Sequence, residues 1–203
     1  MYVALSFDDG PNTVTTPQVL DILENEHIPA SFFLIGQNIT GESVPVIQRE
    51  QSLGCDIECH SWTHSDMTKM TKEAIQDEIV RTCSLIKKIT GTTPSFFRPP
   101  YIRVNDTLYE AVHLPFICGM GVDDWVADVS AAERAARVIS GVRDGTIVLL
   151  HDFSGNVNTV EALKTFIPSL KEKGYTFVTV PQMFSLYGVS PDQPHKIWTY
   201  VKQ

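Results

Sequence analysis

The sequence predicts an α/β fold in which a parallel sheet is covered by helices. Short apolar runs alternate with amphipathic stretches about seven times along the chain. Some runs are apolar throughout, such as Ile-Val-Leu-Leu at 147–150, which is typical of strands buried on both faces. Polar residues gather directly after these runs. About seven strand–helix units can close into a barrel or stay open, and periodicity does not decide between the two.

The strand predictions rest on apolar runs that have the length of single strands. Several are rich in Phe, Ile and Val, which fit a pleated and buried surface. In chain order the runs occupy 2–7, 30–35, 55–59, 95–98, 116–120, 146–150 and 176–180. Each run predicts one strand of the sheet.

Helices are predicted between the strands and after the last one, at 16–26, 43–53, 71–89, 105–112, 131–142, 159–173 and 181–186. Thr16-Pro17 opens the first with a cap residue and a first-turn proline. In the longest, Ile75 and Ile86 belong to an apolar face with charged residues between its members. The proline-containing segment after Gly188 predicts a surface-draped tail.

Composition limits the possible functions. The chain has 203 residues, 43% of them hydrophobic, which fits a single domain over 1–203. With 24 acidic and 16 basic residues the formal net charge is −8, which argues against nucleic acid and allows a neutral sugar polymer. No apolar run is long enough to span a bilayer, and the start lacks the features of a signal peptide. Because the first motif follows Met1 so closely, we expect a domain excised from a longer chain.

Four cysteines are too few for a disulfide framework in a chain of this length. They are Cys55, Cys59, Cys83 and Cys118. A zinc ribbon would need two close pairs, and the last two are not a pair. We therefore expect free, buried thiols.

Residues suited to chemistry follow the predicted strands. They are Asp8-Asp9 after the first strand, His60 and His64 after the third, 98–101 after the fourth, Asp124-Trp125 after the fifth and His151-Asp152 after the sixth. The carboxyl ends of parallel strands form one rim, where active sites of such folds lie. Five separate segments are therefore expected to converge on one patch.

Asp9, His60 and His64 are the predicted ligands of a divalent metal. Neutral imidazole is a preferred zinc ligand, and two histidines four residues apart share a face within one helical turn. Two histidines and one carboxylate leave positions open for water and substrate. Taken alone, Asp-Gly-Pro also suits a plain turn, and the histidines also suit surface or core positions.

Two further pairs suggest acid–base chemistry. Arg98 could compensate the charge of Asp8, although an ordinary surface arginine before a proline turn fits the same pattern. Asp124 would favour the protonated form of His151, which could otherwise be a core histidine. Trp125 is a candidate wall or sugar platform, with a buried core tryptophan as the alternative.

Taken in order, these motifs resemble those of the polysaccharide deacetylases, the family-4 carbohydrate esterases with a NodB-homology domain. Residues 6–11, Ser-Phe-Asp-Asp-Gly-Pro, are similar to the first family motif, usually Thr-Phe-Asp-Asp-Gly-Pro. The second to fifth motifs resemble 60–64, 98–101, 124–125 and 149–151. The matches span nearly the whole chain. The segments 124–125 and 141–152 are particularly similar to clostridial acetylxylan esterase domains.

The resemblance implies a deformed (β/α) barrel with about seven parallel strands and a bound divalent metal, most often zinc, with cobalt or nickel possible. It implies these roles: Asp8 as base, Arg98 as its partner, His151 as general acid tuned by Asp124, and Asp9, His60 and His64 as metal ligands. The implied substrate-binding residues are Tyr101, whose N–H would bind the oxyanion, Pro100, Trp125, and Leu149 at the acetyl methyl.

The implied function is removal of acetyl groups from an acetylated polysaccharide, by an extracellular or cell-surface monomer. The clostridial likeness favours O-acetyl xylan, and N-acetyl groups of chitin oligomers or peptidoglycan are the close second. One alternative class is an inactive glycan-binding module on a deacetylase scaffold. Another, a polynucleotide phosphoesterase, would need a second metal site and a basic groove.

Two positions depart from the family pattern. The family usually has Gly after the tyrosine of its third motif, where this chain has Ile102. A β-branched residue resists positive φ, so we expect this loop to take another course. The fourth motif usually has an earlier Asp where this chain has Gly121, which leaves the tuning role to Asp124, with Asp123 beside it.

Overall fold

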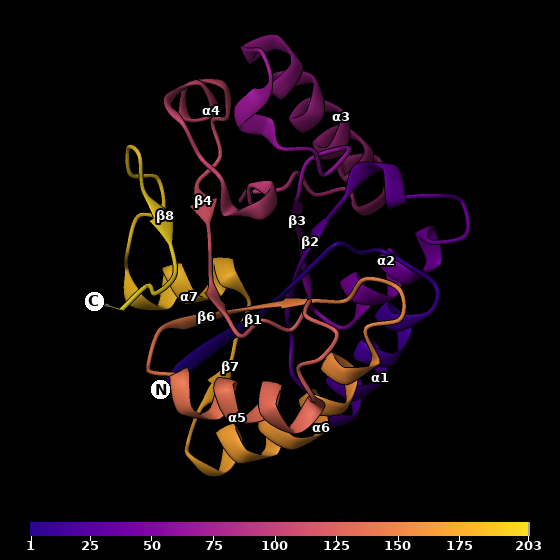
Figure 1. Ribbon diagram of the computed structural model, residues 1–203, viewed down its shortest axis with the longest axis vertical. Coiled ribbons are helices and arrows are strands. Elements are labelled where there is room, and N and C mark those ends of the chain that lie inside the picture. Colours follow the sequence, from indigo (N-terminus) through magenta and orange to yellow (C-terminus); the bar gives the residue numbers. More distant parts are fainter. Residues whose placement is uncertain (203) are drawn as a thin grey trace.

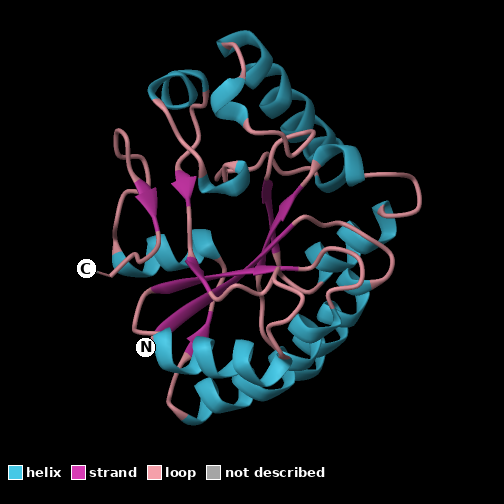
Figure 2. Ribbon diagram, in the orientation of Figure 1, coloured by secondary structure: helices cyan, strands magenta, loops and turns pink. Residues whose placement is uncertain are grey.

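The computed structural model describes residues 1–202, and Figures 1 and 2 show its helices and strands. The strands are β1 (Tyr2–Asp8), β2 (Ser31–Leu34), β3 (Asp56–Cys59), β4 (Phe116–Ile117), β5 (Met120–Gly121), β6 (Thr146–His151), β7 (Thr176–Phe177) and β8 (Ile197–Trp198). The helices are α1 (Thr15–Glu26), α2 (Val44–Ser52), α3 (Lys72–Thr90), α4 (Asp106–Ala111), α5 (Ala131–Gly141), α6 (Val157–Glu172) and α7 (Val180–Tyr187). Short 3₁₀ turns occupy Gly36–Asn38, Met67–Lys69 and Pro100–Ile102.

The main sheet is parallel, in the order β3-β2-β1-β6-β5, with β7 also pairing with β1. Strands β4 and β8 form a second parallel pair. Single-residue bridges, rather than continuous strands, join the two sheets: Phe97 bridges Cys59 and Phe116, and Tyr200 bridges Thr146. The predicted α/β fold is confirmed, and the described strands do not close into a continuous barrel, which is consistent with a deformed barrel.

The core lies on both faces of β1, the indigo strand beside β6 at the centre of Figure 1. Leu5 and Phe7 pack into the apolar layer between the sheet and helices α1, α5 and α6. Ala4 belongs to the cluster on the other face. Because side chains alternate along a strand, Ser6 and Asp8 share the face of Ala4 and lie inside the barrel. The end of β1 therefore carries a carboxylate into the interior.

Two strand predictions were wrong in detail. The run 95–98 forms only an isolated bridge at Phe97, because the Glu58 carboxylate accepts hydrogen bonds from the N–H groups of Ser95 and Phe96 at 2.7 and 2.8 Å. The run 116–120 splits into β4 and β5 at Gly119, whose φ of 87° interrupts the extended backbone.

The prediction of a surface-draped tail holds for residues 189–196, which are exposed or half-buried, and was wrong for the segment after them. Residues 197–198 form β8, and Trp198 is 1% exposed. Its ring packs edge-on against Phe184 with centroids 5.0 Å apart, and the N–H of Ile147 donates to the Thr199 carbonyl at 3.1 Å. Burial of a tryptophan of this size is sufficient to hold the segment against the barrel.

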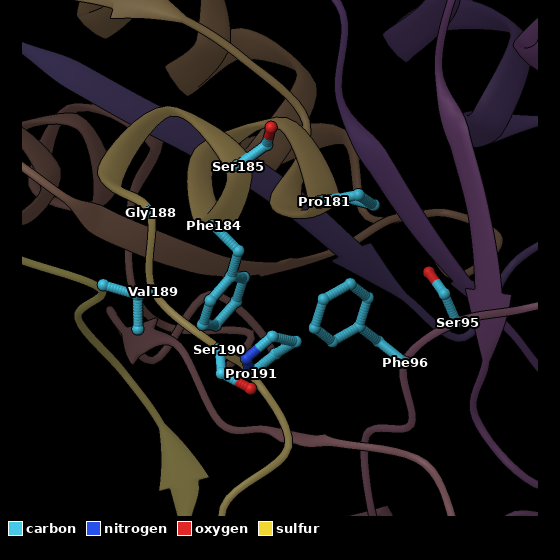
Figure 3. A pocket seen from close by; sticks show the side chains of 9 residues that line it. All are labelled: Ser95, Phe96, Pro181, Phe184, Ser185, Gly188, Val189, Ser190 and Pro191. Carbon is cyan, nitrogen blue, oxygen red and sulfur yellow. The ribbon is translucent and has the colours of Figure 1, made fainter.

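A hollow of about 450 Å³ lies between α7 and the segment after it (Figure 3). Phe96 and Phe184, whose rings stack with centroids 5.3 Å apart, belong to its lining. The described residues around it include serine and proline but no titratable side chain. The hollow therefore offers no acid, base or metal ligand.

Two further expectations from the sequence concern membrane-spanning segments and the cysteines. Among residues 1–202, no helix is both long enough and apolar enough to cross a membrane. In this described part of the chain the four cysteines are free thiols, but only Cys55 and Cys59 are buried, and Cys83 and Cys118 are partly exposed. The expectation of burial was therefore wrong for two of the four.

Candidate active site

A cavity of about 360 Å³ opens at the carboxyl ends of β1, β3 and β6. Eight of the eleven residues singled out in the sequence line it, together with one that was not assigned a role, Ile102. The lining residues are Asp8, Asp9, His60, His64, Tyr101, Ile102, Trp125, Leu149 and His151. Arg98, Pro100 and Asp124 are buried and do not line the cavity. The predicted convergence of five segments is present.

The three predicted metal ligands lie together on one side of the cavity. Their ligand atoms all lie within 4.8 Å of one another. Asp9 Oδ1 is 3.4 Å from His64 Nε2 and 3.6 Å from His60 Nε2. This oxygen is buried and has no hydrogen-bond partner among the described residues. A buried carboxylate oxygen without a partner is costly, and two imidazole nitrogens and one carboxylate form a typical donor set, so the residues fit a divalent metal.

Neighbouring groups orient these ligands. His60 Nδ1 donates to the Arg98 carbonyl oxygen at 2.7 Å, which leaves Nε2 free to face the cavity. Burial, the largest influence, lowers the pKa of His60 to about 3 and keeps the imidazole neutral, which is the ligand form. Asn38 Nδ2 donates to the Asp9 carbonyl oxygen at 2.9 Å and holds the backbone of that ligand.

The two histidines do not share a helical turn, contrary to the spacing argument. Ser61 and His64 have φ values of 69° and 58°, and the segment between β3 and the turn at 67–69 is a loop. Glu78 on α3 fixes this loop, because its carboxylate accepts from the N–H groups of Trp62 and Thr63 at 2.7 and 2.8 Å. The His64 N–H donates to Ser61 Oγ at 3.0 Å.

Arg98 is fully buried and forms an ion pair with Asp8, which excludes an ordinary surface role. Its Nη1 donates to Asp8 Oδ1 at 2.5 Å, and its Nη2 donates to Ser6 Oγ at 2.7 Å. Burial raises the pKa of Asp8 more than the Arg98 charge lowers it, so the net shift is upward. The second oxygen, Oδ2, is 3.6 Å from His60 Nε2. Asp8 is thus a carboxylate with one anchored oxygen beside the metal ligands.

His151 and Asp124 form the second polar pair of the rim. His151 Nδ1 lies 2.7 Å from Asp124 Oδ1, and the His151 backbone N–H donates to Oδ2 at 2.7 Å. Burial lowers the pKa of His151, but the hydrogen bond and charge of Asp124, with the charges of Asp8 and Asp9, outweigh it and raise the pKa to about 9. His151 is therefore protonated at neutral pH. Trp125 is 49% exposed with its ring 5.4 Å from that of His151, so it is not a core residue.

Sequence reasoning placed Asp152 at the rim beside His151 without assigning it a role, and it missed Thr159 and Arg134, which support Asp124 from behind. Asp152 is buried, accepts a hydrogen bond from Thr16 Oγ1, and donates its backbone N–H to the Asp8 carbonyl at 3.1 Å. Alternation along β6 turns its side chain away from the rim towards α1, although it directly follows His151. Thr159 donates to Asp124 Oδ2 at 2.9 Å, and Arg134 donates to Thr159 Oγ1 at 2.9 Å. Nothing in a single sequence links these distant positions.

The loop 100–102 contradicts the expectation for Ile102. Tyr101 and Ile102 have φ values of 57° and 55°, so the β-branched residue does adopt positive φ. The Ile102 N–H donates to the Pro99 carbonyl at 3.0 Å, which closes a tight turn. Tyr101 is 59% exposed, and its ring centroid is 4.8 Å from that of His64. Pro100 lies beneath the turn, where it supports Tyr101 rather than facing the cavity.

The fold and the rim together define the class of protein: a deformed α/β barrel whose strand ends carry an Asp-His-His triplet, an Asp–Arg pair and a His–Asp pair. Residues 1–115 match the family described as polysaccharide deacetylase. The chain belongs to this family, as its resemblance implied.

Individual relatives extend the match over the whole chain. This chain is 50% identical over 200 residues to a bifunctional xylanase/deacetylase of Pseudobutyrivibrio xylanivorans. The match covers 98% of this chain and 33% of the relative, so this chain spans about a third of the relative's length. It is 35% identical to a peptidoglycan-N-acetylglucosamine deacetylase of Bacillus cereus, covering 90% of this chain and 68% of that one. A family 4 acetyl xylan esterase from Clostridium thermocellum, solved with a cobalt ion, superposes with a TM-score of 0.96 at 42% identity and full coverage of both chains.

Proposed function

We propose that this chain is a metal-dependent carbohydrate deacetylase that hydrolyses acetyl groups on a polysaccharide. The observation that carries the proposal is the placement of a base and an acid around one metal-binding triplet. Asp8 and His151 are register partners on the paired strands β1 and β6, and both line the cavity with Asp9, His60 and His64. Hydrolysis of an acetyl group needs a proton removed from water and a proton given to the leaving group.

Asp9, His60 and His64 would hold the metal, and we propose zinc because two imidazole nitrogens and one carboxylate suit it. The bound ion would polarise the acetyl carbonyl and lower the pKa of the attacking water. The related Clostridium thermocellum esterase was solved with a cobalt ion, which supports the binding of a divalent ion in this fold. The unpartnered Oδ1 of Asp9 supports it independently.

The remaining residues of the site transfer the protons and bind the oxyanion. Asp8 accepts the proton of the attacking water, and the Arg98 guanidinium at 2.5 Å holds one of its oxygens in place. His151, protonated at neutral pH, donates a proton to the leaving oxygen or nitrogen of the sugar. The Tyr101 N–H binds the developing oxyanion, which is the kind of interaction that stabilises a transition state selectively.

The substrate is recognised by apolar side chains at the mouth of the cavity, which is its solvent-facing opening. Leu149, 6% exposed, provides a surface for the acetyl methyl, and the half-exposed Trp125 provides a platform for the sugar ring. We favour O-acetyl xylan, because the Clostridium relative is an acetyl xylan esterase and the Pseudobutyrivibrio relative joins a xylanase to a deacetylase. A polymer of this kind is found outside the cell, and we propose that the protein acts there, as a single domain of a longer chain.

The test compares acetate release from acetylxylan and from N-acetylglucosamine oligomers by the zinc-loaded protein. We expect release from at least one of them and a higher kcat/KM on acetylxylan. Asp8→Asn, which retains the shape of the side chain, serves as the matched inactive variant. A metal-loaded protein that binds these glycans and releases no acetate from either would contradict the proposal and favour an inactive glycan-binding module.

A further inference from the structure

Strained backbone is concentrated around the site. Of the eight non-glycine residues with positive φ in the described part of the chain, six belong to the segments that form the rim. These are Asp9, Ser61, His64, Tyr101, Ile102 and Asp123. Strain of this kind persists where the surrounding structure enforces it, and it tends to mark functional positions.

Ile102 stands out within this group because of its chemistry. It is the one β-branched residue with positive φ among residues 1–202, with a φ of 55°. A branched Cβ crowds the backbone in the left-handed region, whereas glycine adopts that region without steric cost. The backbone course alone therefore favours glycine here. An isoleucine at a position whose backbone favours glycine points to a role for its side chain.

The surroundings of Ile102 place that side chain at the mouth of the cavity. It is half-buried and lines the cavity together with Tyr101, Trp125 and Leu149. The turn is anchored on both sides, by Pro99 and Pro100 before it and by Arg103 after it. The Arg103 guanidinium bonds Asp66 Oδ2 at 2.5 Å, and its Cζ lies 5.6 Å from the centroid of the Tyr101 ring.

We propose that Ile102 is a specificity-determining residue for the deacetylation proposed above, on which this inference rests. Its branched side chain narrows the mouth and contacts the acetylated ring. It thereby favours small pentose rings, which lack an exocyclic hydroxymethyl group, over the larger N-acetylhexosamine rings. The backbone strain is the structural consequence of holding that side chain against the substrate.

The size of the effect follows from how apolar pockets discriminate. One methylene more or less in an apolar site changes kcat/KM by roughly 10–200-fold. Removing the four-carbon side chain would widen the cavity that Ile102 lines with Tyr101 and Trp125. The pentose ring then loses a contact, and the hexosamine ring gains room. The ratio of the two kcat/KM values, which cancels changes in metal content or enzyme concentration, reports this difference.

The experiment measures kcat/KM on acetylated xylo-oligosaccharides and on N-acetylglucosamine oligomers for wild type, Ile102→Gly, Ile102→Ala and Ile102→Val. We expect Ile102→Gly and Ile102→Ala to lower the pentose-to-hexosamine ratio by about 10-fold or more, and Ile102→Val, which keeps the branch at Cβ and loses one methyl group, to lower it less than either. His27→Gly is the matched control, because His27 is an exposed residue with a φ of 53° at the end of α1, away from the cavity. It should leave the ratio unchanged.

Two outcomes overturn the inference. An unchanged ratio in both Ile102→Gly and Ile102→Ala shows that the side chain does not select the ring. A ratio that falls in Ile102→Gly alone assigns the effect to backbone freedom, because alanine also removes the branched side chain. Failure of the proposed function looks different: wild type then releases acetate from neither glycan, and the inference falls with it. Thermal unfolding checks the fold of each variant, and we expect Ile102→Gly to be at least as stable as Ile102→Ala.

Discussion

The two halves of the site are built in different ways. In the triplet of Asp9, His60 and His64, the closest ligand atoms stand 3.4 and 3.6 Å apart, too far for direct hydrogen bonds, and Asp9 Oδ1 has no partner among residues 1–202. In the pair of His151 and Asp124, two hydrogen bonds of 2.7 Å join the residues directly. The first half would be completed by the proposed metal ion, and the second is completed by the protein itself.

The two halves also differ in the residues that support them. The loop with His64 is held largely through Glu78, and it contains two residues with positive φ. Asp124 is instead fully buried and bonded by Thr159, which Arg134 bonds in turn. We therefore expect the metal half to depend on conditions such as metal concentration, and the acid half to depend on the integrity of the fold.

Removing the metal should produce the largest effect. Chelation or His64→Ala should reduce acetate release by about 10³-fold or more, because a bound metal supplies several kcal/mol of transition-state stabilisation. Re-addition of zinc should restore the chelated wild type but not the variant. Elemental analysis checks the cause, with the exposed His113→Ala as control. Full metal occupancy in His64→Ala would contradict its assignment as a ligand.

Asp8→Asn should give the next largest loss. It should reduce kcat by roughly 10²–10⁴-fold, the usual contribution of a positioned acid or base. Metal content should stay at the wild-type level, because Asp8 bonds Arg98 rather than the triplet. This separates the variant from His64→Ala. A wild-type rate would show that another group takes the proton.

Asp124→Asn should move the pH profile. Without the charge of Asp124, the burial of His151 is no longer outweighed, and its pKa should fall from about 9 to its ordinary 6.5 or below. The basic limb of the pH profile of kcat/KM should move to lower pH by the same amount. At pH 8 this lowers kcat/KM by about 30-fold, because less His151 is protonated. Asp123→Asn is the control, since Asp123 bonds the half-buried Arg137 rather than His151. Coincident profiles for wild type and Asp124→Asn would exclude the tuning role.

The same pair links stability to pH. The pKa of His151 is higher in the folded protein than the ordinary value of 6.5. Its protonation therefore stabilises the fold fully below pH 6.5, and this contribution is lost as the pH rises towards 9. We expect the free energy of unfolding of wild type to decrease across this window more steeply than that of Asp124→Asn. Parallel curves in urea titrations at several pH values would contradict the linkage.

Thr159→Val should have the smallest effect on catalysis and a clear effect on stability. The buried oxygen of Asp124 and one donor of Arg134 each lose a partner, which costs about 1–3 kcal/mol. At about 2–4 °C per kcal/mol for a chain of this size, differential scanning calorimetry resolves the change. Thr159→Ser keeps the hydroxyl and should remain close to wild type. Metal affinity should not change, and a loss of metal would show that the two halves are coupled.

The sequence was sufficient to predict the fold class and the residues of the rim, for a physical reason. Apolar runs mark parallel strands, and the carboxyl ends of parallel strands meet, so Asp8 and His151 could be placed together without knowing the fold in detail. Their partners Arg98 and Asp124 follow other strands and were found in the same way. The rule extends only to residues at, or a few positions after, the end of a predicted strand.

The parts that could not be predicted depend on contacts between distant segments. Strand β8 has two residues, too few for any periodicity, and it forms because Trp198 packs against Phe184. The φ of Ile102 opposes its local preference and is enforced by the turn between Pro99 and Arg103. In both cases tertiary packing decides the conformation against, or without, a local signal.

The pairing of Asp8 with His151 also has a consequence for the order of folding events. The two residues are register partners on neighbouring strands that lie about 140 residues apart in the sequence. The hydrogen bond from Ser6 Oγ to the Val148 carbonyl, for example, joins residues 142 positions apart. Such pairing requires closure of a long loop, which is slow compared with local helix formation. The proposed base and the proposed acid therefore come together only when β6 joins β1. During refolding, the return of acetate release should follow that pairing step rather than the earlier appearance of helix.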